Sequence, residues 1–159
     1  MNMLSKLFVM FGTALLAMAG VVRSSNPTKK HSGPVVKLVL PLNQGGETAG
    51  DILSEANPFG VQCRIIDASL VITVASGGAA TADIGVAANG TTTASNIFDG
   101  VDINAAATYN PTDDSGTNGL LDTDPGVIWE SSEFITGDIL TGVDGAIEAV
   151  LTVWCVLGQ

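Results

Sequence analysis

AIEAVLTVWCVL, residues 146–157, is the stretch that decides the fold. Side chains on a β-strand point alternately to its two faces, so every second residue shares a face. One face of this stretch is apolar throughout, whereas the other carries Glu148 and Thr152; the apolar positions are Ile147, Ala149, Leu151, Val153, Cys155 and Leu157. The pattern predicts a long strand with one side buried against a second layer.

Shorter strand-like runs precede this stretch. Residues 61–66, 69–75 and 81–87 are the clearest, and the run SLVITV within them is apolar enough for a strand buried on both faces. A tight hairpin turn is expected at Ser76–Ala79 and a second turn at Asn89-Gly90. Residues 35–42, mostly β-branched or aliphatic, are expected to form the first strand, and short strands are expected at 127–130 and 133–136. Residues 97–103 alternate weakly, and residues 51–56 fit a short strand or a helical turn.

No convincing helix follows Val22. Short strands with regular turn signals are typical of two-layered all-β domains. We therefore expect residues 35–159 to form an antiparallel β-sandwich or jelly roll of about eight strands. The tetrapeptide GDIL occurs at 50–53 and again at 137–140, but four residues are too few to indicate a repeat.

The charges are sorted along the chain. Five of the six Lys and Arg residues lie in the first 37 positions, and all sixteen acidic residues come later together with Arg64, so the two parts carry +5 and −15 of the net −10. A body this acidic is not expected to bind nucleic acid directly, because phosphate binding needs clustered Lys and Arg. The basic segment could lie on an acidic surface, including that of a second copy, or it could be a solvated linker.

The N-terminal residues 1–23 are apolar and residues 24–34 form a basic linker. Leu7–Val22 is uncharged and as a helix would span roughly 24 Å, short of a hydrocarbon core of about 30 Å. Lys6 and the Ala17-Met18-Ala19 run match a secretion signal. The segment could be a cleaved signal, a membrane anchor or an arm that docks on other proteins. The residues expected to bind a partner through such an arm are Leu7, Phe8, Phe11, Leu15, Leu16, Arg23, Lys29, Lys30 and Lys37.

The sequence contains no catalytic constellation. His31 is the one histidine, no Gly-x-Ser-x-Gly motif is present, and no glycine-rich loop has phosphate-binding spacing. We expect no catalytic residue and no cofactor. The weak candidates for a calcium site are in the loop 110–126, where a solvated surface loop is the favoured interpretation because the EF-hand pattern fails; they are Asp113, Asp114, Asp122 and Asp124.

Cysteines and aromatic residues leave alternatives open. Cys63 and Cys155 lie in apolar strand-like runs, where free buried thiols are favoured. A disulfide between them is the alternative and would stabilise by up to about 4–5 kcal/mol. Trp154 is expected in the core, Trp129 in the core or at a subunit interface, and Phe134 could also contact a partner subunit.

Several short motifs in residues 50–157 resemble those of small structural proteins from tailed-phage virions, of the capsid decoration, cement or head-fibre type. They are Asn57-Pro58-Phe59-Gly60, Arg64-Ile65-Ile66-Asp67-Ala68, ADIGVA at 82–87, IFDGVD at 97–102, Asn118-Gly119 and Ile135-Thr136-Gly137. The resemblance implies a β-sandwich or jelly roll without catalytic residues that binds a capsid, often as a trimer. It does not extend to residues 1–34.

Two hypotheses follow. In the first, the chain is a virion structural protein that stabilises a shell through its N-terminal arm. Its partners would then be the major capsid protein or other shell proteins and further copies of itself, with a trimer favoured. Residues 7–22 could also contact lipid. In the second, the chain is a secreted or membrane-anchored surface or filament subunit with a signal peptide and an oxidised Cys63–Cys155 pair.

Overall fold

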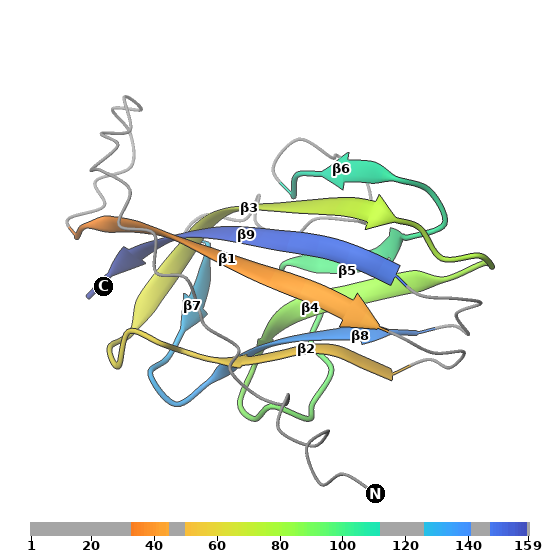
Figure 1. The fold of residues 1–159 in the computed structure, drawn as a ribbon. Helices are drawn as coiled ribbons and strands as arrows, with labels where there is room; N and C mark the ends of the chain where they lie inside the picture. The colour runs from red at the N-terminus through yellow and green to blue at the C-terminus, as the bar shows by residue number, and fades with distance from the viewer. Residues whose placement is uncertain (1–32, 45–49, 112–125, 141–146, 159) are drawn as a thin grey trace, which may run out of the picture.

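The computed structural model describes residues 33–44, 50–111, 126–140 and 147–158, and these residues form two stacked antiparallel sheets (Figure 1). The predicted all-β sandwich is confirmed, with nine strands in the described ranges. They are β1 (Val35–Gln44), β2 (Gly50–Ala56), β3 (Cys63–Val74), β4 (Thr81–Ala87), β5 (Phe98–Asp102), β6 (Ala107–Tyr109), β7 (Val127–Trp129), β8 (Phe134–Ile139) and β9 (Ile147–Leu157).

The strand order is that of a jelly roll. The first sheet runs β1-β9-β3-β6, with β7 pairing the other half of β3, and the second runs β2-β8-β4-β5. The first four strands of the chain alternate between the two sheets. The connections from β5 to β6 and from β8 to β9 also cross from the second sheet to the first. This double-sheet arrangement matches the predicted fold class, and β7 is its one additional strand in the described part of the chain.

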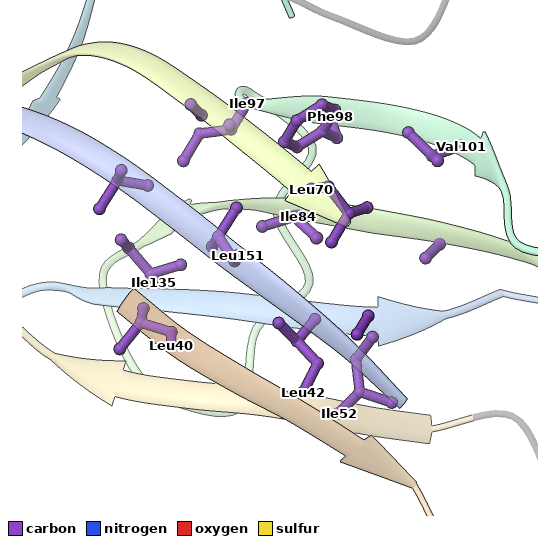
Figure 2. Packing of buried hydrophobic residues seen from close by; sticks show 14 of the residues in the cluster. Leu40, Leu42, Ile52, Leu70, Ile84, Ile97, Phe98, Val101, Ile135 and Leu151 are labelled. Carbon is purple, nitrogen blue, oxygen red and sulfur yellow. The ribbon is translucent and has the colours of Figure 1, made fainter. Parts of the chain in front are cut away.

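β9 lies between β1 and β3 in the first sheet, and one of its faces is buried, as its alternation predicts. Its odd-numbered residues from Ile147 to Cys155 are buried, whereas Glu148 is exposed. Leu151 pairs with Leu40 on β1 and with Leu70 on β3, so three leucines from adjacent strands point inward together. Figure 2 shows these side chains between the sheets, with Ile84 and Ile135 of the second sheet.

β3 differs from the prediction of two separate strands in this region. The runs 61–66 and 69–75 are one strand, interrupted by a β-bulge where the register with β9 shifts between Ile65 and Asp67. Cys63 and Ile65 point inward before the bulge, and Ala68 and Leu70 point inward after it. A bulge changes which alternate positions face the core, so the strand loses the simple period of two.

The hairpin expected at Ser76–Ala79 is wrong, because β3 and β4 belong to different sheets. The connection crosses from one layer to the other and is fixed by backbone bonds on either side: Ser76 N donates to Ile103 O at 2.9 Å, and Ile103 N donates to Ala80 O at 3.2 Å. Residues 51–56, for which a strand or a helical turn was open, lie in β2. β6 was not predicted from the sequence; it is a three-residue strand opposite Leu70–Ile72.

The apolar segment 1–23 and nearly all of the linker 24–34 lie outside the described residues. Within the described ranges, no helix has the length and apolar character needed to cross a membrane.

Candidate functional site

Three aspartates form a row across the outer face of the second sheet. Strand pairing places Asp51 on β2 opposite Asp138 on β8, and Asp138 opposite Asp83 on β4. Asp51 is exposed, whereas Asp138 and Asp83 are only 8% and 9% exposed. Asp83 accepts a hydrogen bond from Gly100 N at 2.8 Å. We call these three residues the carboxylate row.

A hydrogen bond joins Asp51 to Asp138 within the row, and this bond raises the pKa of Asp51 above its ordinary value of 3.8. The negative charge of Asp138 raises this pKa further, and desolvation adds a smaller contribution. Two carboxyl groups can share a hydrogen bond only when one of them carries a proton. Asp51 therefore binds a proton more readily than an isolated aspartate does.

The part of the chain that follows Lys37 contains little positive charge to balance the carboxylate row. Between residues 38 and 159 the sequence contains one basic residue, Arg64, and it lies on β3 in the other sheet. Like charges directly opposite each other weaken strand pairing. The row is not a metal site in the described part of the chain, where no group of three or more His, Cys, Asp or Glu side chains could hold a metal ion. The weak calcium candidates Asp113, Asp114, Asp122 and Asp124 lie outside the described residues.

The carboxylate row was not predicted from the sequence, although a signal for it was present. The two GDIL segments pair with each other, since Gly50 lies opposite Ile139 and Asp51 opposite Asp138. The segment ADI at 82–84 then extends the pairing through Asp83. The short identity thus reflects adjacent strands with the same local pattern.

Asn57, directly after the end of β2, connects several backbone segments through hydrogen bonds. Its Nδ2 donates to the carbonyls of Val61 at 3.0 Å and of Trp129 and Glu130 at 3.1 Å, and its Oδ1 accepts from Phe59 N at 2.9 Å. The Phe59 ring meets Trp129 edge to face, with centroids 6.2 Å apart. This first motif of the family resemblance is therefore a structural turn.

The two tryptophans differ in burial. Trp129 is fully buried in its own chain and its Nε1 donates to Glu133 O at 3.0 Å, which favours the core alternative for Trp129. Trp154, expected in the core, lies half-buried on the outer face of the first sheet, because it occupies the face of β9 opposite Leu151 and Val153. The Lys37 amine lies 5.6 Å from the Trp154 ring centroid, a cation–π contact.

The remaining predicted contact residues are only partly described. Phe134 is half-buried on the outer side of β8, close to Gly90. Of the nine predicted arm residues, Lys37 alone lies in the described part of the chain, and it is exposed on β1. The other eight (Leu7, Phe8, Phe11, Leu15, Leu16, Arg23, Lys29 and Lys30) lie outside it.

Cys63 and Cys155 are free thiols in the structure, and both are completely buried. They lie on adjacent strands, because Ile65 pairs with Cys155 and Cys63 pairs with Leu157. The disulfide alternative thus involves two residues that the fold brings together.

No family model matches the sequence, and no curated protein matches it. Two solved structures resemble the fold. A chain from the acidic stable capsid structure of Helicobacter pylori bacteriophage KHP30 has 10% sequence identity and a TM-score of 0.46, covering 78% of this chain and 90% of that chain. A chain from the capsid of Ralstonia phage GP4 has 16% identity and the same TM-score of 0.46, covering 88% and 94%.

Proposed function

We propose that this chain is a non-enzymatic structural component of a virion that works by binding shell proteins. The jelly-roll strand order carries the proposal, together with the motif resemblance to small tailed-phage structural proteins. Viral capsid domains are one of the classes built on double-sheet jelly rolls, alongside lectins and cupins. Because a fold alone does not define a function, the surface and the charges must supply the rest of the argument.

The motifs that resemble those of tailed-phage structural proteins make contacts within the sandwich itself. Asn57 closes a turn against β7, and Asp83 of the ADIGVA motif accepts a bond from Gly100 of the IFDGVD motif. Phe98 and Val101 of the latter motif are fully buried. These residues build the sandwich, so the proposal assigns partner binding to the surface and to the N-terminal segment.

The separation of charge along the chain indicates which surfaces would attract each other in the proposed binding. The first 37 residues carry +5 and the remainder carries −15. Segments of opposite charge attract each other during encounter and fix register more than they add affinity. Lys29 and Lys30 of one copy would orient on an acidic shell protein or on the acidic body of another copy. The same balance of charge disfavours direct binding to nucleic acid.

The apolar residues 7–22 would supply most of the affinity. Each buried Leu, Phe, Met or Val side chain contributes about 1.5–3 kcal/mol before ordering costs are subtracted. Contacts made only in the assembled particle stabilise that particle by mass action. In this proposal the finer role is decoration or cementing of a capsid, with the major capsid protein or other shell proteins as partners and a trimer as the favoured oligomer.

Deletion of residues 1–34 tests the proposal. Particles assembled with the intact and the truncated chain are purified, and copies per particle are counted by quantitative mass spectrometry. We expect the truncated chain to be largely lost from particles while its circular dichroism still shows a folded β-protein. A matched control, Ser24→Ala with Ser25→Ala, should retain full occupancy. Undiminished occupancy of the truncated chain would exclude the proposed arm.

The second candidate is a secreted or surface-anchored β-sandwich subunit. The observation that favours it is the basic, apolar and small-residue order from Lys6 to Ala19. Intact mass of the native protein separates the two candidates. A mature chain beginning at Gly20 supports export, whereas a start at Met1 or Asn2 supports the arm.

A further inference from the structure

The two cysteines of the chain occupy neighbouring positions on the inner face of the first sheet. Cys63 begins β3, and Cys155 lies two residues before the end of β9. The pairs Cys63–Leu157 and Ile65–Cys155 place the cysteines diagonally across adjacent strands. Both side chains are 0% exposed, and the two thiols share a hydrogen bond.

In the closed sandwich the two thiols have different environments. The hydrogen bond from Cys155 lowers the pKa of the Cys63 thiol below its ordinary value of 9.0, although burial opposes this change. The same hydrogen bond raises the pKa of Cys155, and burial raises it further. The Asn57 amide also lies 4.0 Å from the Cys63 sulfur, a weak second donor. Thiolates are the reacting species in thiol chemistry.

A disulfide between these two positions requires a shift of the backbone next to them. Diagonal neighbours on paired strands are farther apart than directly opposed residues, whereas a disulfide needs its two Cβ atoms about 3.5–4.5 Å apart. The bulge of β3 begins immediately after Ile65, and β9 ends at Leu157. A bulge and a strand end are the places where a sheet shifts at least cost to its remaining ladder.

We propose that Cys63 and Cys155 are a disulfide-forming site that cross-links the two central strands β3 and β9 when the chain meets a low-molecular-weight disulfide such as oxidised glutathione. The thiolate of one cysteine attacks one sulfur of that disulfide, forming a mixed disulfide and releasing one small thiolate. The other cysteine then loses its proton and attacks the protein sulfur of the mixed disulfide, releasing the second small thiolate. Two protein thiols are oxidised and one small disulfide is reduced to two thiols.

Complete burial determines when this exchange happens. A small disulfide cannot reach either sulfur in the closed sandwich, so the reaction takes place while the chain folds or when β9 opens. The cross-link would close a long loop, since the two residues are 92 positions apart (155 − 63). Loop closure of this kind restricts the unfolded chain and favours the folded one. The site does not depend on the proposed virion function.

The test refolds the full-length protein from denaturant in a glutathione redox buffer, followed by acid quenching, denaturation and alkylation with iodoacetamide. Because the chain contains only two cysteines, intact mass counts the free thiols directly. We expect a monomer that carries no alkyl group and has a mass lower by two hydrogens than that of the fully reduced protein. Two alkyl groups, a persistent glutathione adduct or a disulfide-linked dimer would each overturn the proposal.

The single variants Cys63→Ser and Cys155→Ser are matched controls, and each should end with one alkyl group or one glutathione adduct. Stability gives a second measurement that does not need the variants to fold. The oxidised wild-type protein should unfold at a higher urea concentration than the same protein reduced with dithiothreitol. An equal or lower midpoint for the oxidised protein would contradict the expected cross-link between β3 and β9.

Discussion

The side-chain amide of Asn57 donates a hydrogen bond to the backbone carbonyl of Trp129 at 3.1 Å, joining residues 72 positions apart. The same nitrogen contacts the carbonyls of Glu130 and Val61, while the side-chain oxygen accepts from Phe59 N. One small side chain thereby closes a turn and attaches it to the end of β7. The arrangement needs an amide, because both a donor and an acceptor are used and Asn57 is only 8% exposed.

Asn57→Asp preserves the shape of the side chain and removes its donor. A carboxylate would face three carbonyl oxygens, so we expect the free energy of unfolding to fall by at least about 2 kcal/mol, measured by urea denaturation at neutral pH. Asn89→Asp is the matched control, since the bonds recorded for Asn89 all end at its oxygen. The free energy of unfolding of Asn89→Asp should differ from that of the wild-type protein by no more than about 0.5 kcal/mol. Equal losses in the two variants would contradict the role of the Asn57 donor.

Leu151→Ala tests the central position of β9. Leu151 is fully buried between Leu40 and Leu70 on the flanking strands, so truncation leaves a cavity in the middle of the sandwich. We expect the free energy of unfolding to fall by about 2–5 kcal/mol in urea or thermal denaturation. Thr152→Ala, on the opposite face of the same strand, should change stability by less than about 1 kcal/mol. A similar cost at both positions would contradict the assigned faces of β9.

The alternation of β9 was readable because it is local: six apolar positions with a period of two specify a face without knowledge of the partner strands. The same alternation already placed Trp154 on the other face, and the expectation of a core Trp154 failed because it relied on residue type alone. Trp129 lies in a three-residue strand, where no period can be measured, and its burial depends on pairing with Cys63.

Features that depend on pairing between distant strands could not be predicted. The turn composition at Ser76–Ala79 is compatible with a hairpin, and only the assignment of β3 and β4 to different sheets excludes it. The carboxylate row depends on a register between Asp51 and Asp138, which are 87 positions apart (138 − 51). Local patterns predict which residues form strands, whereas the order of strands in a sheet is set by the packing of the whole core.

Gly85→Ala tests the segment that covers the outer face of β4. A Cβ at Gly85 would lie 2.5 Å from the Asn96 side-chain oxygen, 2.7 Å from Asn96 N and 2.8 Å from the Ala94 carbonyl carbon. The Asn96 side chain is held by Val86, whose N donates to it at 2.7 Å and whose carbonyl accepts from it at 3.2 Å. The segment must shift, so we expect a loss of about 1–3 kcal/mol in the free energy of unfolding.

The exposed Thr93 of the same segment provides the control for Gly85→Ala. Thr93→Ala should leave the urea midpoint almost unchanged. The double variant Gly85→Ala with Asn96→Ala separates side-chain from backbone crowding. Because two of the three close atoms belong to the backbone, the double variant should remain destabilised. Full recovery would show that the Asn96 side chain alone excludes a Cβ.

The carboxylate row gives the protein a pH dependence of defined sign. The hydrogen bond to Asp138 raises the pKa of Asp51, so the folded chain binds this proton more tightly than the unfolded chain does. The stabilising contribution of the protonated pair is fully present below the unfolded pKa of about 3.9 and is lost as the pH rises through the folded pKa. At neutral pH the ionised pair opposes the pairing of β2 with β8.

Asp51→Asn should therefore raise the urea midpoint at pH 7, because it removes one charge and keeps a group that donates to Asp138. The advantage over the wild-type chain should shrink as the pH falls toward about 3.5, where Asp51 itself is largely protonated. Asp99→Asn on β5 changes the net charge equally at an exposed position away from the facing pair. If the two variants shift the midpoint by the same amount at every pH, net charge alone explains the effect and the Asp51–Asp138 contact does not.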